Sequence, residues 1–187
     1  MAVGDRDRWN DKWAEAGRGT SHGSSLVELV SPWLPTTGSL LDVAGGGSPD
    51  SLAFARLGLD VTVTDVSDVG LIQARQRALA EDLDITTIEA DLEEEPLPAG
   101  PFDVVTVANY LQRDLFTAMA ERLAAGGVLA VVIATEINLE RNEHPRRDFL
   151  LAADELPALV GDLTVVHHSE AWRENGRHEA HLVGQRG

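Results

Sequence analysis

The stretch from Leu40 to Ser48, which reads LLDVAGGGS, decides the fold of this chain. An apolar run ends in an acid and three glycines, and Pro49 then opens a segment with helical periodicity. Small residues after a strand let a ligand approach the backbone closely, and proline is tolerated in the first turn of a helix. The stretch predicts a strand over residues 39–44, a ligand-binding turn and a helix over residues 50–57.

The same alternation of strand and helix runs along the rest of the chain. Apolar, partly β-branched runs bounded by turn residues predict strands, and segments of helical periodicity predict helices. Strands are expected at residues 39–44, 60–65, 85–89, 102–108, 127–134, 163–168 and 179–184, and helices at residues 7–16, 24–34, 50–57, 69–80, 111–124 and 149–160. The predicted fold class is α/β: a doubly wound, mostly parallel, seven-stranded sheet of Rossmann-like type, with helices on both faces.

The end of the chain departs from that alternation. No helical segment separates the last two expected strands, and Glu174-Asn175-Gly176 lies between them. Asn-Gly is a strong signal for a tight hairpin turn, so these strands are expected to pair antiparallel, with the last strand reversed. Because there is no repeat, low-complexity linker or shift in composition, residues 1–187 are expected to form one domain.

The composition excludes several classes of function. The chain has 15 basic and 31 acidic residues, and its formal net charge of −16 repels the phosphate backbone of nucleic acids. The absence of cysteine excludes disulfides, thiolate metal sites and cysteine nucleophiles. Residues 1–10 lack the apolar core of a signal peptide, and the longest apolar run, 128–134, suits a buried strand. We expect a cytoplasmic protein without membrane or nucleic-acid partners; the oligomeric state is not predicted.

Unusual polar residues stand at the ends of the expected strands. Asp65 ends the second strand, nineteen residues after Gly46, and an acid there can accept hydrogen bonds from ribose hydroxyls. Asp91 follows the third strand, where it can read the amino group of a purine. Asn109 and Tyr110 follow the fourth. Each feature has an ordinary explanation, because acids at strand ends also cap helices and glycines also form plain turns. Their order along the chain nevertheless favours a nucleoside site.

Two other nucleotide sites do not fit the glycines. A phosphate-binding P-loop needs a lysine beside them, and the one lysine of the chain is Lys12. A dinucleotide fingerprint that starts at Gly45 would need a third glycine where Asp50 stands, and an acid there faces the pyrophosphate. Asp42 is likewise ill-placed for an anion, so it favours a cationic ligand.

These residues resemble the motifs of the class I S-adenosylmethionine-dependent methyltransferases. Residues 40–48 are similar to the first motif of that family, Asp/Glu-x-Gly-x-Gly-x-Gly, with Ala44 and Ser48 in place of two glycines. Further likenesses lie at residues 60–67 (DVTVTDVS), 90–92, 102–105 and 123–129, so the resemblance covers roughly residues 24–185. The resemblance implies a class I methyltransferase fold, S-adenosylmethionine as cofactor and S-adenosylhomocysteine as product.

The resemblance also assigns cofactor contacts. Asp42 would anchor the methionine amino end, directly or through water, and Asp65 would hold the ribose. Val66 would pack on adenine, and Asp91 with Leu92 would read its edge. The remaining expected contacts are the close backbone approach at Ala44, Gly45 and Gly46 and the methionine portion beside Ala108 and Asn109. No metal is implied, and a general base is needed only if the acceptor must lose a proton.

A narrower likeness concerns residues 8–13, 110–116 and 147–151. These are similar to small bacterial methyltransferases of the tellurite-resistance and thiopurine type, in which an N-terminal aromatic helix covers the cofactor. Residues 1–23 are therefore expected to be a helical lid on a core of residues 24–187. Trp9 and Trp13 share one helical face. They contact either the cofactor or, equally, only the protein body.

Substrate-side candidates rest on charge and position. Arg113, Arg146 and Arg147 suit an anionic acceptor, His144 suits a base, and Tyr110 lies where the reacting end should be; for the arginines and histidine, ordinary surface exposure is the alternative. The terminal histidines, His167, His168, His178 and His181, invite a metal site. Adjacent strand positions face opposite sides, so no metal is expected.

The predicted function is methyl transfer from S-adenosylmethionine to a small-molecule acceptor by in-line displacement. The alternatives are a non-catalytic or degenerate S-adenosylmethionine-binding protein and a nicotinamide-dependent oxidoreductase. Methylation of protein or RNA is disfavoured by the acidic composition. The acceptor and its reacting atom are not predicted.

Overall fold

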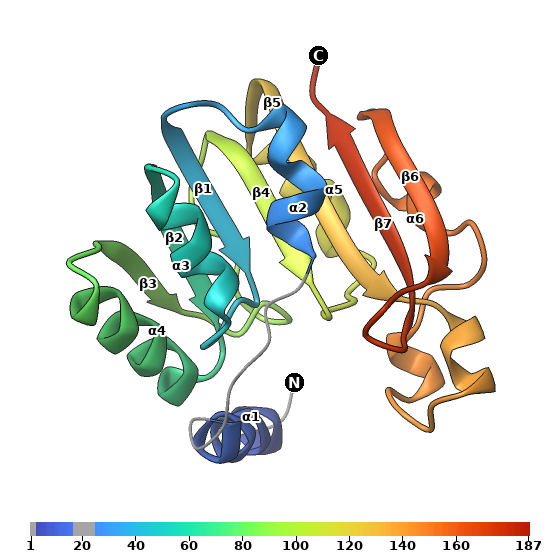
Figure 1. Ribbon diagram of the computed structural model, residues 1–187, viewed down its shortest axis with the longest axis horizontal. Coiled ribbons are helices and arrows are strands. Elements are labelled where there is room, and N and C mark those ends of the chain that lie inside the picture. The colour runs from blue at the N-terminus through green and yellow to red at the C-terminus, as the bar shows by residue number, and fades with distance from the viewer. Residues whose placement is uncertain (1–2, 17–24) are drawn as a thin grey trace.

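The computed structural model describes residues 3–16 and 25–187, which build one twisted sheet with helices on both faces (Figure 1). Seven strands lie side by side in the order β3-β2-β1-β4-β5-β7-β6. In chain order they are β1 (Gly38–Val43), β2 (Leu59–Asp65), β3 (Ile85–Glu89), β4 (Phe102–Ala108), β5 (Leu123–Ala134), β6 (Thr164–Trp172) and β7 (His178–Gln185). The expected seven-stranded α/β sheet is confirmed.

The sheet is parallel except at β7. β1 pairs parallel with β2 and β4, and β7 pairs antiparallel with both β5 and β6. The turn between β6 and β7 closes where the Asn-Gly pair predicts it: the Arg173 N–H donates to the Arg177 carbonyl at 2.8 Å, and Gly176 has a φ of +78°. The reversed last strand is therefore confirmed. Its turn lies at the edge of the sheet where the parallel strands end.

Helices cover the two faces in separate groups (Figure 1). Alternate strand residues point to opposite faces, so Leu40 packs in one buried cluster and Leu41 in the other. On the first face lie α2 (Leu26–Val30), α3 (Pro49–Arg56) and α4 (Asp68–Ala80), and on the second lie α5 (Leu115–Glu121) and α6 (Leu156–Leu159). Short 3-10 turns complete the set: η1 (Ser31–Trp33), η2 (Glu136–Glu140) and η3 (Arg147–Phe149).

Three expected helices are shorter than the sequence pattern predicts. The helix expected at 111–124 is reduced to α5, because Leu123 already pairs with Phe102 at the start of β5. The helix expected at 149–160 is wrong over its first half: Leu151 forms an isolated parallel bridge to Thr135, and Pro157 stands in the first turn of what remains, α6. The helix expected at 24–34 becomes α2 followed by η1. Residue 24 lies outside the described part of the chain.

The helix α1 (Val3–Ala16) stands apart from the two layers, below the ends of the parallel strands (Figure 1). It contacts α4, and the side chain of Arg6 pairs with Glu89, the last residue of β3, at 2.7 Å. Residues 17–23 of the expected lid segment also lie outside the described residues. Over the described residues, no helix combines the length and the hydropathy needed to cross a membrane.

Candidate functional site

A cavity of about 500 Å³ runs along the edge at which the parallel strands end. Its walls come from α1, the loops after β1, β2, β3 and β4, and the turn between β6 and β7. The residues that line it are Trp9, Trp13, Asp42, Ala44, Gly45, Ser48, Asp50, Asp65, Val66, Ala90, Asp91, Leu92, Ala108, Asn109, Tyr110, Asn175, Arg177 and Glu179. Eleven of the twelve residues expected to contact a cofactor are in this wall; Gly46 is not.

The loop after β1 is shaped by residues without large side chains. Ala44 has a φ of +53° and Gly46 a φ of +50°, in the left-handed region. A Cβ added to Gly45 would lie 2.4 Å from a carboxylate oxygen of Asp42. Ala44 thus holds a backbone conformation that favours glycine, which gives the physical reason for glycine in the motif it resembles. Glycine at position 45 lets the loop pack directly on Asp42, and both Ala44 and Gly45 line the cavity.

Asp42 is a buried acid beneath this loop. Its two oxygens accept hydrogen bonds from the hydroxyls of Ser51 at 2.6 Å and Thr106 at 2.9 Å. Burial raises the pKa of Asp42 to about 7, and the hydroxyls only partly offset that effect. A carboxyl with this pKa gains from a cation in the cavity, because the cation favours its ionised form.

Asp65 ends β2, with 7% of its surface exposed. The Ser67 N–H donates to Oδ1 at 2.8 Å, and the backbone N–H groups of Gly46 and Val66 also support the charged form. Burial outweighs these hydrogen bonds and raises the pKa of Asp65 to about 6. The carboxylate is held rigidly at the cavity wall, which suits a group that must receive hydrogen bonds from a ligand.

Asp91 and Ser48 line the cavity and also hold the backbone of their own segments in place. Asp91 Oδ1 accepts the Glu93 N–H at 3.1 Å, so this acid also caps the turn that follows β3. Ser48 is the N-cap of α3, where its hydroxyl accepts the Asp50 N–H at 3.2 Å and donates to Asp50 Oδ2 at 2.9 Å. Serine at the last glycine position of the motif therefore has a structural reason: it begins the helix.

Helix α1 docks on the glycines through Trp13. A Cβ added to Gly46 would lie 2.6 Å from the indole ring, and one added to Gly70 would lie 2.8 Å from it. Asn10 continues this contact: it accepts the Ser67 hydroxyl at 2.6 Å and donates to Asp68 at 2.7 Å. Gly46 is therefore covered by α1 instead of lining the cavity. Trp9 and Trp13 both form part of the wall, while Trp13 also anchors the helix to the body.

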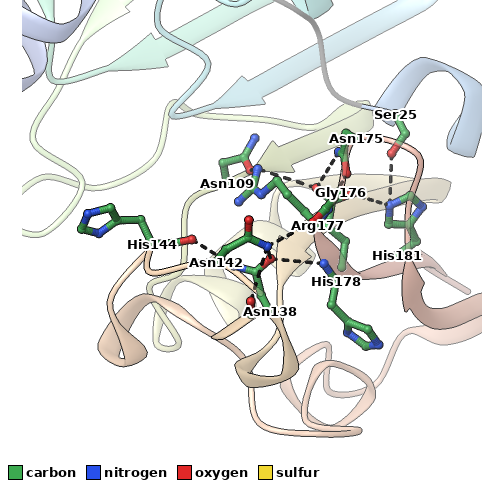
Figure 2. Close-up of polar contacts among 11 residues, drawn as sticks. Ser25, Asn109, Asn138, Asn142, His144, Asn175, Gly176, Arg177, His178 and His181 are labelled. Atoms are coloured by element: carbon green, nitrogen blue, oxygen red, sulfur yellow. Dashed lines mark hydrogen bonds and ion pairs between the residues drawn. The ribbon is translucent and has the colours of Figure 1, made fainter. Parts of the chain in front are cut away.

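The turn between β6 and β7 closes the cavity beyond β4. The guanidinium of Arg177 donates to the side-chain oxygen of Asn109, which has a φ of +58° (Figure 2). The Asn142 side chain holds the turn by donating to the Gly176 carbonyl at 3.0 Å. Asn175, Arg177 and Glu179 were not expected in the site. The signal that points to them is the reversed strand, whose first residues return to the edge where the parallel strands end.

The other substrate-side candidates do not line the cavity, apart from Tyr110. Arg113 is engaged by Glu155, with one nitrogen–oxygen contact at 2.9 Å, and Arg147 pairs with Glu136 at 2.5 Å. Arg146 lies over the ring of Phe149, with 5.3 Å from its guanidinium carbon to the ring centre. His144 contributes its carbonyl to Asn138, and its ring points away from the turn (Figure 2). The three arginines thus already have partners outside the cavity: a carboxylate for Arg113 and for Arg147, and an aromatic ring for Arg146.

The terminal histidines do not act together. His178 contacts Thr135 and His181 contacts Glu179, on opposite faces of β7. His168 lies instead beside Glu170, two residues along β6, and Asp154; the ligand atoms of these three are within 4.8 Å of one another. This group is away from the cavity. Its members already interact, because the Asp154 N–H donates to Glu170 at 3.0 Å.

Comparison with known sequences connects this architecture to one family. Residues 40–127 match the family described as the methyltransferase domain. The ubiquinone/menaquinone biosynthesis C-methyltransferase UbiE of Azotobacter vinelandii is 33% identical to this chain over 103 residues. That match covers 50% of this chain, which spans about two fifths (41%) of the length of this curated relative.

Solved structures share the fold over almost the whole chain. TehB from Haemophilus influenzae has a TM-score of 0.74 and 20% identity, over 95% of this chain and 67% of that chain. Magnesium protoporphyrin IX methyltransferase (ChlM) from Synechocystis, solved with bound SAH, has a TM-score of 0.75 and 16% identity, over 97% of each chain. At these identities the similarity establishes the fold.

Proposed function

We propose that this chain, which has the class I, Rossmann-like fold and whose residues 40–127 match the methyltransferase-domain family, binds S-adenosylmethionine in the cavity and transfers the methyl group to a small-molecule acceptor. The observation that carries the proposal is the order of groups along the cavity. The sheet order sets Asp91 and Asp65 at one end, the glycine loop with Asp42 in the middle, and Asn109 at the other. A nucleoside with a cationic tail fits that sequence of groups.

The chain's own residues would bind and orient the cofactor. Asp65 accepts the ribose hydroxyls, Asp91 and Leu92 read the adenine edge, and Val66 packs on the ring. Asp42 serves the methionine amino group, directly or through water. Ala44 and Gly45 let the backbone approach the cofactor closely, and Gly46 supports their loop. Ala108 and Asn109 lie beside the methionine portion. Trp9 and Trp13 lie over the site. When bound, S-adenosylmethionine supplies an activated methyl group, so the residues mainly align the reactants and exclude water.

A small acceptor and a single functional unit complete the proposal. The net charge of −16 opposes a polynucleotide substrate. We propose that residues 1–187 work as one domain, with α1 as a cover over the core. We also propose that the protein works in the cytoplasm, because a chain without cysteine forms no disulfides and so needs no oxidising compartment. A nicotinamide-dependent oxidoreductase is disfavoured by Asp50, a buried acid in the cavity wall where a pyrophosphate would approach.

Calorimetry and methyl transfer test this function together. Titration with S-adenosylmethionine and S-adenosylhomocysteine should give saturable heat, and NADH should give none. The absence of heat and of a thermal shift at millimolar ligand would reject the proposal. Transfer of labelled methyl groups to a panel of hydroxyl, amine, thiol and metalloid acceptors then separates an enzyme from a non-catalytic binding protein. For the variants of acidic residues described below, the control for loss of a negative charge is Asp60→Ala, which removes an exposed acid from β2.

A further inference from the structure

We propose that Glu179 is the proton acceptor of the reaction and that the methyl acceptor is a neutral hydroxyl compound. This inference rests on the proposed function, because it concerns the far end of the same cavity. Glu179 stands second in β7, in the wall formed by the β6–β7 turn, with 3% of its surface exposed. It is a buried acid that no expected cofactor contact uses.

The position of Glu179 sets it at the acceptor end. The acids expected to hold the nucleoside follow β2 and β3, at one side of the sheet, whereas β7 lies beyond β4 and β5. Arg177, which bonds Asn109 at the tip of β4, comes two residues before Glu179 on the same turn. A methyl group presented beside Asn109 therefore faces a compartment whose walls include Tyr110, Arg177 and Glu179.

Three neighbours hold the Glu179 carboxylate in its ionised form. His181 Nε2 lies 3.2 Å from Oε2, the Asn175 side chain donates to Oε1 at 3.1 Å, and an Arg177 nitrogen lies 3.6 Å from Oε1. Burial by itself would raise the pKa of Glu179, but these contacts outweigh it and hold the pKa below its usual range. At neutral pH the acceptor compartment thus contains a fixed, buried carboxylate, and the Arg177 guanidinium beside it is already engaged by Glu179 and by Asn109.

That charge discriminates between classes of acceptor. A thiolate or a metalloid oxyanion is already charged, so it needs no base and is repelled by a buried carboxylate. A neutral hydroxyl donates a hydrogen bond to the carboxylate and must lose its proton as it attacks. The acceptor compartment also includes the aromatic side chain of Tyr110, which suits a hydroxyl carried on an apolar frame.

The step balances with groups that the chain and cofactor provide. A lone pair of the hydroxyl oxygen forms a bond to the methyl carbon, and the carbon–sulfur bond breaks with its electron pair staying on sulfur. The hydroxyl proton passes to a Glu179 oxygen. The products are a methyl ether, the neutral thioether S-adenosylhomocysteine and a protonated Glu179, which returns its proton to solvent once the product leaves. No oxidant, reductant or metal is consumed.

His181 is a positioning residue in this scheme. It is buried, its Nε2 lies 3.2 Å from Glu179 Oε2, and the same nitrogen lies 3.1 Å from the Ser25 hydroxyl (Figure 2). It is absent from the cavity wall. Replacing His181 should shift the pH dependence of transfer, because the charge state of Glu179 depends on this contact, with little change in cofactor affinity.

Binding of two matched chromogenic probes tests the proposal without turnover. The probes are para-nitrophenol and para-nitrothiophenol, titrated into protein saturated with S-adenosylhomocysteine at about pH 6, where the thiol is the more ionised of the two because thiols are more acidic than phenols. Wild-type protein should bind the phenol roughly 10- to 100-fold more tightly than the thiolate. Glu179→Gln should lose that preference, and Glu174→Gln, on the exposed side of the same turn, should keep it.

The outcomes separate this inference from the proposed function. If wild-type protein fails to bind S-adenosylhomocysteine, the proposed function fails and this inference with it. If wild-type protein binds S-adenosylhomocysteine but prefers the thiolate, binds neither probe, or shows the same preference as Glu179→Gln, only the assignment of Glu179 is overturned. S-adenosylhomocysteine affinity and the circular dichroism spectrum report whether each variant is folded, and Glu179→Asp is the second variant.

Turnover provides the second measurement. Transfer of a labelled methyl group to para-nitrophenol should fall by roughly 100-fold or more in kcat for Glu179→Gln, the scale of general base catalysis, with a smaller change in KM. Glu179→Asp should retain part of the rate, since it keeps a carboxylate. Equal kcat values for wild type and Glu179→Gln would overturn the role as proton acceptor.

Discussion

The hydroxyl of Ser51 donates to Asp42 at 2.6 Å, under a loop in which a Cβ at Gly45 would collide with the same carboxylate. Because Asp42 is buried, its ionised form is unfavourable until a cation binds nearby. The raised pKa of Asp42 and its expected role in binding thus come from one arrangement. Activity and stability should respond in opposite directions when Asp42 is changed.

Replacing Asp42 with asparagine should stabilise the unliganded protein and weaken cofactor binding. The folded-state pKa of about 7 lies above the unfolded value of 3.8, so the carboxyl costs stability progressively as the pH rises between those values. The gain in Asp42→Asn should be absent near pH 4 and complete above about pH 7, on the order of 4 kcal/mol. Thermal unfolding over this pH range measures it. Asp60→Asn, an exposed change, should show no such trend.

Cofactor affinity should fall as the pH falls below about 7. Asp42 and Asp65, with pKa values of about 7 and about 6, are both partly protonated in the unliganded protein near pH 6, and a cationic ligand requires the ionised form of Asp42. Binding at pH 6 should therefore release protons. Calorimetry in two buffers of different ionisation enthalpy counts them. Equal apparent enthalpies in both buffers would contradict this coupling.

Replacing Asp65 with alanine should weaken binding of S-adenosylhomocysteine by roughly 1.5–3 kcal/mol, the usual range for hydrogen bonds to a charged group. The reason is the fixed position of the carboxylate, held by the Ser67 N–H at 2.8 Å. Calorimetry on Asp65→Ala and the exposed control Asp60→Ala gives the comparison. Unchanged affinity in a folded Asp65→Ala protein would mean that the ribose is held elsewhere.

Displacing Trp13 should weaken the cofactor complex. Gly46→Ala introduces a Cβ 2.6 Å from the indole ring at a φ of +50°, whereas Gly126→Ala introduces one at a φ of +79° with no atom within 4 Å. Both variants carry backbone strain, and only the first moves Trp13. Gly46→Ala should lose more affinity than Gly126→Ala, by roughly 0.5–2 kcal/mol if the indole faces the sulfonium.

Deleting residues 1–16 extends the same test, since it removes the whole of α1. If α1 covers the cofactor, the truncated protein binds S-adenosylhomocysteine more weakly. If α1 only anchors to Ser67 and Asp68, the truncated protein loses thermal stability without ligand and keeps its affinity per folded molecule.

The sequence predicts well which residues line the side of the cavity to which we assign the nucleoside, because that side is local. Asp42 and Asp65 lie at the ends of β1 and β2 and Asp91 follows the end of β3, and the parallel order of those strands brings their ends together. The acceptor side depends on distant partners. Glu179 enters the wall only because β7 inserts between β5 and β6. The sequence could not show that Arg113 is paired outside the site, because its partner Glu155 lies 42 residues away in the chain.

Helix boundaries failed for a similar reason. Leu150 and Leu151 continue a helical pattern, yet the backbone of Leu151 exchanges hydrogen bonds with Ala134 and Glu136 at 3.1 and 2.8 Å. Periodicity cannot reveal that an extended segment is needed beside a strand end.

The place of β7 in the sheet also constrains how the protein assembles. β6 is synthesised before β7 but has no direct neighbour in the sheet other than β7, so β6 cannot join until β7 has been made. β6 and β7, joined by the Asn175-Gly176 turn, therefore complete this edge of the sheet after β5 has been made. A chain that stops before residue 178 lacks Glu179, one of the residues that line the cavity. The wall of the cavity is therefore complete only after β7 has been made.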